Sequence, residues 1–238
     1  MGSDRASGAP VGRRVILGML AAGGVGVLFG ARAQYTISTA LAPITERDPT
    51  GLTGLLPSGG GWRYYSVTGI QPRRDENSYR LTVGGLVKTP TELTLAALRS
   101  LPQTGLTKDF QCVTGWRVRE VPWSGVLLRD LLARVGVAAQ ATALRLVSFD
   151  GAYTESLTLE QADRSDVLIA LQMYGKPVTR AHGGPVRLYV APMYGYKSLK
   201  WLGGIEVTDR VVPGYWEERG YDVDAWIGRS NGRDDEPV

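Results

Sequence analysis

The stretch DFQCVTGW, residues 109–116, holds the only cysteine of the chain, Cys112. A disulfide within the chain is therefore excluded, because Cys112 has no partner. The chain also has a single histidine, His182. A lone thiol in a block typical of a folded domain calls for a chemical role, and the surrounding sequence limits which roles are open to it.

The composition is that of an ordinary globular protein. Of the 238 residues, 43% are hydrophobic and 21% are charged, which excludes a disordered chain and a polytopic membrane protein. The formal charge is +4, and lysines and arginines are spread along the chain in runs of at most two. We therefore expect no nucleic-acid partner, because proteins that bind nucleic acids gather their basic residues on one face.

Residues 1–33 are typical of an export signal or an N-terminal anchor. Arg13 and Arg14 precede an uncharged run, 15–31, and ARA follows at 31–33. The paired arginines resemble a twin-arginine signal, which predicts transport by the twin-arginine export machinery to the periplasm or the outer face of the cell membrane. We expect a flexible linker at 34–61, one folded domain at 62–230 and a disordered tail at 231–238.

Residue patterns favour an α+β fold, with more strands than helices and no βαβ rhythm. WRYYSVTGI, 62–70, has strand chemistry, and YRLTVGGLV, 79–87, indicates two short strands around Gly84 and Gly85. A short helix is predicted at 94–102, capped by Thr94, and a clearer one at 124–136, capped by Ser124 and ended by Gly136. Further extended segments are expected at 107–113, 143–151, 166–175, 183–192 and 199–209.

Three roles remain open for Cys112. A structural zinc site needs about four ligands and CxxC redox chemistry needs two cysteines, so the lone thiol fits neither. Cys112 could be a nucleophile activated by His182, as in thiol acyl-transferases. It could instead give one thiolate to a metal whose other ligands come from an organic cofactor. It could also be a buried cysteine that acts only as a small hydrophobic side chain.

The flanks of Cys112 and His182 resemble the sulfite oxidase family of molybdenum-cofactor enzymes. The first block is the C-x-x-x-W of Cys112 followed by W-x-G-V-x-L-x-x-L-L at 123–132. The second is H-G-x-P-x-R at 182–187, and the third is G-x-x-S-x-K-W at 195–201. The three blocks stand in the family's order, and the resemblance covers about 62–210. It implies a sulfite-oxidase-type molybdopterin-binding domain of mixed β-sheets with a few short helices.

The resemblance also implies the roles of individual residues. Cys112 would be the ligand to molybdenum and thereby the catalytic residue, since molybdopterin brings two dithiolene sulfurs and one soft thiolate completes the centre. Arg187 and Lys200, with the turn at 195–198, would hold the phosphate of the cofactor, and His182 would hydrogen-bond the pterin or the phosphate. The remaining candidates for cofactor contacts are Tyr65, Ser66, Ser148, Asp150, Ser198 and Leu199.

The function that the resemblance implies is an exported oxidoreductase that transfers an oxygen atom with two electrons. In size and export signal the chain is similar to the catalytic subunit of the bacterial periplasmic protein-methionine-sulfoxide reductases, which favours reduction of a sulfoxide or a similar S- or N-oxide. It departs from them at His182, where they have Asn, and at VTGW, where they have VEAW. Sulfite oxidation, or a cofactor-free binding module on the same fold, is the alternative. A membrane haem or quinone-linked protein is the expected electron-transfer partner.

Overall fold

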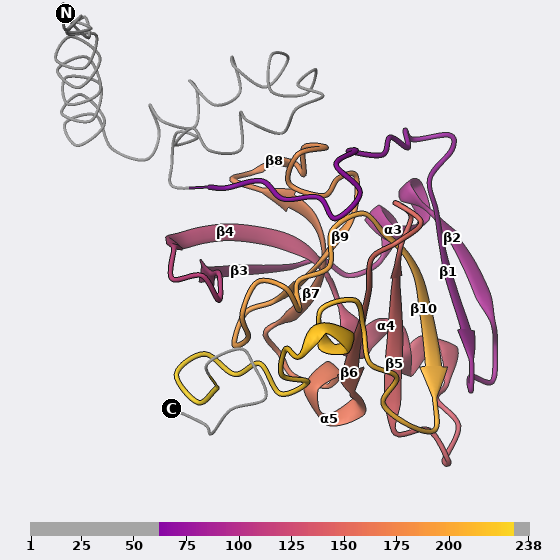
Figure 1. The fold of residues 1–238 in the computed structure, drawn as a ribbon. Coiled ribbons are helices and arrows are strands. Elements are labelled where there is room, and N and C mark those ends of the chain that lie inside the picture. The colour runs from indigo at the N-terminus through magenta and orange to yellow at the C-terminus, as the bar shows by residue number, and fades with distance from the viewer. Residues whose placement is uncertain (1–61, 231–238) are drawn as a thin grey trace, which may run out of the picture.

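The computed structural model describes residues 62–230, which fold into two five-stranded sheets and three short α-helices (Figure 1). This architecture confirms the prediction of an α+β fold with mixed sheets and few helices. Within the described part of the chain, no helix is long and apolar enough to span a membrane. The predicted export signal, linker and tail at 1–33, 34–61 and 231–238 lie outside the described residues.

The first sheet, at the right in Figure 1, has the strand order β2-β1-β10-β5-β6. Strands β1 and β10 are parallel, and every other pair in this sheet is antiparallel. Two of the helices, α3 and α5, follow directly on strands of this sheet and contact them. The elements are β1 (Arg80–Gly85), β2 (Thr91–Thr94), α3 (Leu95–Ser100), β5 (Ala143–Ser148), β6 (Thr154–Thr158), α5 (Leu159–Ala162) and β10 (Leu202–Thr208).

The second sheet, at the left in Figure 1, has the order β3-β4-β7-β8. Strand β9 pairs with the first part of β7, on the edge opposite β4, where β8 pairs with the end of β7. All pairings in this sheet are antiparallel. A 3-10 helix, η2 (Glu217–Arg219), follows the last strand of the fold. The elements of the second sheet are β3 (Thr104–Gln111), β4 (Arg117–Leu127), α4 (Leu128–Val135), β7 (Val167–Met173), β8 (Lys176–Pro177) and β9 (Arg187–Val190).

Strand β7 is buried on both faces and divides two hydrophobic clusters. Its residues Val167, Ile169 and Leu171 belong to the main core, together with α4 and the inner face of the first sheet. Leu168 and Ala170 alternate with them and face an aromatic cluster on the other side. That cluster contains Trp62, Phe110, Trp123 and Tyr189, so one wall of the second sheet is lined by rings.

The predicted helix at 124–136 is wrong at its start. Residues 124–127 belong to β4, and α4 begins at Leu128 with no side-chain cap. The reason is pairing with β7: Gly125 lies opposite Ala170, and the Ser124 hydroxyl bonds the Gln172 side chain. Tertiary pairing thus overrides the helical pattern. The predicted end is confirmed, since the Gly136 amide donates to Leu132 and its φ is 69°.

The predicted strand at 62–70 is also wrong. This segment pairs with no strand; it is extended and then turns, with Trp62 buried in the aromatic cluster. At 79–87 the structure has one strand, β1, because Gly85 has a φ of 78° and Val87 then forms only an isolated bridge. The helix capped by Thr94 is confirmed. Strands β3, β5, β7, β9 and β10 overlap the extended segments predicted from 107, 143, 166, 183 and 199, although β9 begins only at Arg187, after a turn at 181–183.

We expect Gly125→Ala to lower the free energy of unfolding by about 3 kcal/mol, because overpacking a dense strand pair displaces backbone. A Cβ at Gly125 would lie 2.0 Å from the Ile169 carbonyl oxygen. Urea denaturation followed by circular dichroism measures the change. Gly105→Ala, in the neighbouring strand, is the matched control: its Cβ would lie 4.0 Å from the closest atom, so the change should stay below about 0.5 kcal/mol. Equal losses in the two variants would contradict this account of the β4–β7 pairing.

Candidate functional site

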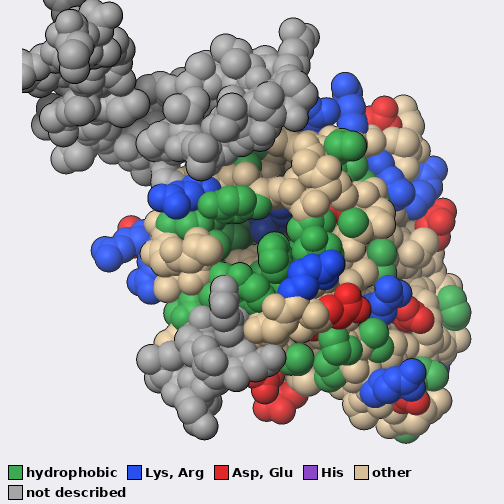
Figure 2. Space-filling view, viewed as in Figure 1, with side chains coloured by type: hydrophobic (Ala, Val, Ile, Leu, Met, Phe, Trp, Pro, Cys, Tyr) green, Lys and Arg blue, Asp and Glu red, His purple; other side chains and the backbone are tan. Residues whose placement is uncertain are grey.

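A pocket opens beside the aromatic cluster, and segments distant in sequence line it. Figure 2 shows a hollow on this face with hydrophobic side chains around it and Lys or Arg atoms at its bottom. Its empty volume is about 770 Å³, open space at the mouth included. The lining residues are Trp62–Val67, Phe110, Cys112, Trp116, Asp150, Tyr153, Ala181, His182, Arg187, Gly195, Tyr196, Ser198, Lys200, Trp201 and Trp216.

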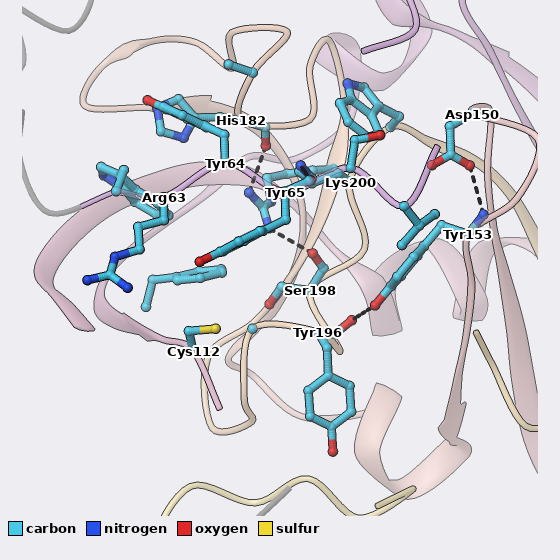
Figure 3. A pocket seen from close by; sticks show the side chains of 18 of the residues that line it. Arg63, Tyr64, Tyr65, Cys112, Asp150, Tyr153, His182, Tyr196, Ser198 and Lys200 are labelled. Carbon is cyan, nitrogen blue, oxygen red and sulfur yellow. Dashed lines mark hydrogen bonds between the residues drawn. The ribbon is translucent and has the colours of Figure 1, made fainter. Parts of the chain in front are cut away.

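Cys112 stands in a tight turn directly after β3. The Cys112 amide donates to the Trp116 carbonyl at 2.9 Å, and the Gly115 amide donates to the Cys112 carbonyl at 3.0 Å. Gly115 has a φ of 94°, which few other residues adopt. The Thr114 hydroxyl donates to the Cys112 sulfur at 3.3 Å, so the thiol is oriented by its own turn. Cys112 is a free, partly exposed thiol that lines the pocket (Figure 3).

Arg187 at the start of β9 is a buried cation bound to backbone carbonyls. Its guanidinium donates to His182 at 2.7 Å, to Ser198 at 2.7 Å and to Leu188 at 3.2 Å. These bonds engage three of its five N–H groups and leave two for a ligand. Burial lowers the pKa of Arg187 to about 10, so it stays charged at neutral pH. The second and third motif blocks are therefore tied together by one side chain.

Lys200 is a second cation in the pocket wall. Its ammonium donates to the Tyr65 carbonyl and lies 4.3 Å from the centre of the Trp201 ring. Burial, together with the charge of Arg187, lowers the pKa of Lys200 to about 7, although Asp150 acts in the opposite direction. Within residues 62–230, neither Arg187 nor Lys200 forms an ion pair with a carboxylate. Uncompensated cations of this kind favour an anionic ligand.

His182 lies between these cations and the first segment of the pocket. Its Nε2 is 3.1 Å from the Tyr64 hydroxyl, and its ring packs at 4.8 Å against Trp62. Burial, followed by the charges of Arg187 and Lys200, lowers the pKa of His182 to about 3. The imidazole is therefore neutral at physiological pH and serves as a hydrogen-bonding group.

Of the other predicted contacts, Tyr65, Ser66, Asp150 and Ser198 line the pocket, and Ser148 and Leu199 do not. Figure 3 shows Asp150 at one end of the site, where its carboxylate accepts the amides of residues 152 and 153. The Ser148 hydroxyl accepts the Asp150 amide at 3.1 Å, so Ser148 supports the loop from behind. Leu199 is fully buried in the main core.

Several lining residues were missed in the sequence. Trp116 closes the C-x-x-x-W block and Tyr64 belongs to the aromatic run WRYY, so composition offered a signal for both. Trp216 lies beyond the motif blocks, and nothing in its local pattern pointed to the pocket. Among the described residues, no group of three or more His, Cys, Asp or Glu side chains could hold a metal ion.

A buried ionic triad of Glu155, Lys197 and Glu217 includes a residue of the loop at 195–200, most of which lines the pocket. The Lys197 ammonium donates to Glu155 at 2.9 Å and to Glu217, and all three side chains are almost fully buried. Burial raises the pKa of Glu155 to about 8, so this acid keeps its proton at neutral pH, while Glu217 stays ionised against Lys197. Removing one member of a buried pair costs about 3–5 kcal/mol. The triad therefore fixes the segments that carry its members.

The residues present fit an organic cofactor that carries a soft metal and an anionic end. Cys112 offers a soft thiolate, the donor that such metals prefer. Arg187 and Lys200 offer charge-assisted hydrogen bonds to a phosphate, and a carboxylate does not occupy them.

Comparison with known proteins gives a family and several relatives. The model of the oxidoreductase molybdopterin binding domain matches residues 68–216. An uncharacterized oxidoreductase of Bacillus subtilis, YuiH, is 34% identical over 83% of this chain and 95% of its own length. Sulfite oxidase of Arabidopsis thaliana is 32% identical over 60% of this chain and 45% of its own length. A putative protein-methionine-sulfoxide reductase subunit of Azospira oryzae, YedZ1, is 33% identical over 66% and 58%.

A solved structure shares the fold. The sulfane dehydrogenase SoxCD from Paracoccus pantotrophus matches with a TM-score of 0.59 and 23% sequence identity, over 66% of this chain and 44% of that one. At this identity the likeness concerns the fold alone. The chain thus spans nearly the whole Bacillus relative but about half of the Arabidopsis and Azospira proteins.

We expect the cofactor-free protein to bind sulfate less tightly as the pH rises above about 7, because Lys200 then loses the proton that makes it a cation. The loss should reach up to about tenfold per pH unit, as for one linked proton. Isothermal titration calorimetry with sulfate between pH 6 and 9 measures it, since sulfate itself does not titrate there. Lys200→Arg is the matched variant, because arginine stays charged, and its affinity should be nearly flat. The same pH dependence in both proteins would show that another group is responsible.

Proposed function

The chain belongs to the oxidoreductase molybdopterin binding domain family and is a molybdenum-cofactor oxidoreductase, and from this premise we propose that it is an exported enzyme that reduces a sulfoxide or a similar S- or N-oxide. The observation that carries this proposal is the pocket itself. One lining holds a lone thiol, two cations without an ion-pair partner in the described part of the chain, and several aromatic rings. That arrangement provides for a cofactor, and the aromatic part of the lining suits a neutral substrate.

The thiol, the two cations and the histidine have separate tasks in this proposal. Molybdopterin, when bound, supplies the dithiolene ligands of the metal and the two-electron chemistry. Cys112 gives the protein's thiolate, and Thr114 orients it. Arg187 and Lys200 bind the phosphate end, while His182, neutral and bonded to Tyr64, hydrogen-bonds the pterin or the phosphate.

A sulfoxide takes up two electrons and two protons, its S–O bond breaks, and the products are a sulfide and one water molecule. The electrons come from a membrane haem or quinone-linked partner in our proposal. The aromatic lining of Phe110 and Trp116 next to Cys112 supports a neutral substrate with apolar groups. The kinship with the Azospira reductase subunit points the same way.

Oxidation of sulfite is the second candidate. In that reaction sulfite and water give sulfate, two protons and two electrons. The kinship with Arabidopsis sulfite oxidase favours it, and Arg63, which lines the pocket, is a cation that could face an anionic substrate. A cofactor-free binding module is disfavoured, because the pocket keeps the thiol and both cations in one place.

A pair of assays separates the two candidates. Purified protein is first analysed for molybdenum, and one metal per chain is expected. Reduced benzyl viologen with sulfoxides or N-oxides then tests reduction, and ferricyanide with sulfite tests oxidation. Turnover of sulfoxides with none of sulfite is the expected result. Sulfite turnover alone would overturn the proposed direction, and metal-free protein would remove the cofactor from it.

We expect Cys112→Ala to abolish activity and the thiolate-to-metal charge-transfer absorption, while secondary structure and bound pterin persist, because the cations that hold the cofactor are untouched. Absorption spectroscopy, pterin fluorescence and circular dichroism measure these properties. Thr107→Ala, an exposed position on the same strand β3, is the control and should behave like wild type. An active Cys112→Ala enzyme would remove Cys112 from the metal centre.

Export through the twin-arginine machinery is the part of the proposal that rests on sequence alone. Arg13 and Arg14 stand directly before the uncharged run, where the signal requires them. Changing both to lysine should leave folded precursor inside the cell, as fractionation and immunoblotting would detect. Arg5→Lys, in the same basic region but outside the pair, should leave export unchanged. Normal export of the double variant would exclude this route.

A further inference from the structure

The segment at 213–221, which lies outside the three motif blocks, contributes Trp216 to the lining of the pocket. It continues the edge of the first sheet, since the Tyr215 amide donates to the Thr154 carbonyl of β6 at 3.0 Å. Gly214 lies so close to β6 that a Cβ there would be 2.6 Å from the same carbonyl oxygen. The next residue after Tyr215 is Trp216, whose side chain lines the pocket. The segment is thus held against β6, at the edge of the first sheet.

The buried triad of Glu155, Lys197 and Glu217 holds this segment against the loop at 195–200. Glu217, directly after Trp216, binds Lys197 and accepts the Ser156 hydroxyl at 2.8 Å and the Gly214 amide at 2.6 Å. Lys197 stands between Tyr196 and Ser198, which both line the pocket. A buried ion pair therefore fixes the position of Trp216 relative to the loop at 195–200.

Contacts between rings link Trp216 to the loop at 195–200. Its ring lies 5.2 Å from that of Tyr221, which in turn lies 5.4 Å from Tyr196. Gly195, the neighbour of Tyr196, donates its amide to the carbonyl of Gln111 at 2.7 Å, directly before Cys112. Trp216 is thereby linked through Tyr221 and Tyr196 to the turn of Gly195, whose amide binds the carbonyl directly before Cys112.

We propose that Trp216 is a specificity-determining residue that selects sulfoxides with an apolar, preferably aromatic, arm over small ones. This inference rests on the proposed function and deepens it by naming the substrate class. An indole at the mouth buries apolar area of a substrate and stacks on a flat ring in offset or edge-to-face geometry. Phe110 and Trp116 offer further rings at the thiol end, where they pack with centroids 5.6 Å apart.

The test compares wild type, Trp216→Ala and Trp216→Phe in molybdenum-containing protein. Reduced benzyl viologen supplies the electrons, and methyl phenyl sulfoxide and dimethyl sulfoxide are the two substrates. In Trp216→Ala, kcat/KM for methyl phenyl sulfoxide should fall about tenfold or more, mainly through KM, as expected when an aromatic contact of about 1.4 kcal/mol is lost. For dimethyl sulfoxide it should change less than about twofold, and Trp216→Phe should recover most of the loss. Molybdenum content should equal that of wild type.

Trp226→Phe is the matched control. Trp226 lies in the same C-terminal region but does not line the pocket, and its bridge to Met193 is made by backbone. It should retain the substrate preference of wild type. An unchanged ratio of the two substrates in Trp216→Ala would overturn the inference, and so would an equal loss for both. Loss of molybdenum would show that Trp216 contacts the cofactor instead. If molybdenum-containing wild type reduces neither sulfoxide, the proposed function fails and the inference with it.

Discussion

The guanidinium of Arg187 is the interaction on which the site depends. It is buried, and its N–H groups donate to the carbonyls of His182, Leu188 and Ser198. The rings of Phe110 and Trp123 lie about 5.3 Å and 5.4 Å from it, so the same cation also contacts the aromatic wall. Arg187 thereby links the loops of His182 and Ser198 to the second sheet, whose strand β3 precedes the turn of Cys112.

The described part of the chain treats its buried charges in two contrasting ways. Behind the pocket, Lys197 meets Glu217 and a protonated Glu155, so the triad is close to neutral. In the pocket wall, Arg187 and Lys200 face no carboxylate partner, and the pKa values of Lys200 and His182 are lowered as a result of burial and mutual repulsion. Neutral pairing stabilises the framework, whereas unpaired positive charge is retained where a ligand enters.

The motif blocks predicted the cofactor and most of its surroundings because their chemistry is local. Cys112, His182, Arg187 and Lys200 could be chosen from sequence, and all four line the pocket. The errors have a common cause, which is that strand pairing and burial are decided between distant segments. Ser124 was assigned to a helix although β7 draws it into a strand. Leu199 was predicted as a cofactor contact, and its side chain is buried in the core. Trp216 reaches the pocket through a fold-dependent ion pair that no local pattern reveals.

Among the residues that the structure describes, no carboxylate forms an ion pair with Arg187 or Lys200, although Asp150 acts on Lys200 at longer range, and this links cofactor loading to the stability of the protein. Repulsion between the two cations is free energy that an empty pocket retains and an anionic ligand releases, so a loaded chain is the more stable one by mass action. Cellular proteases act on transiently opened molecules, and a difference of one or two kcal/mol changes protein abundance several-fold. Unpaired charge in the wall therefore makes occupancy of the pocket a contribution to stability, and we expect chains that never receive their prosthetic group to be degraded faster.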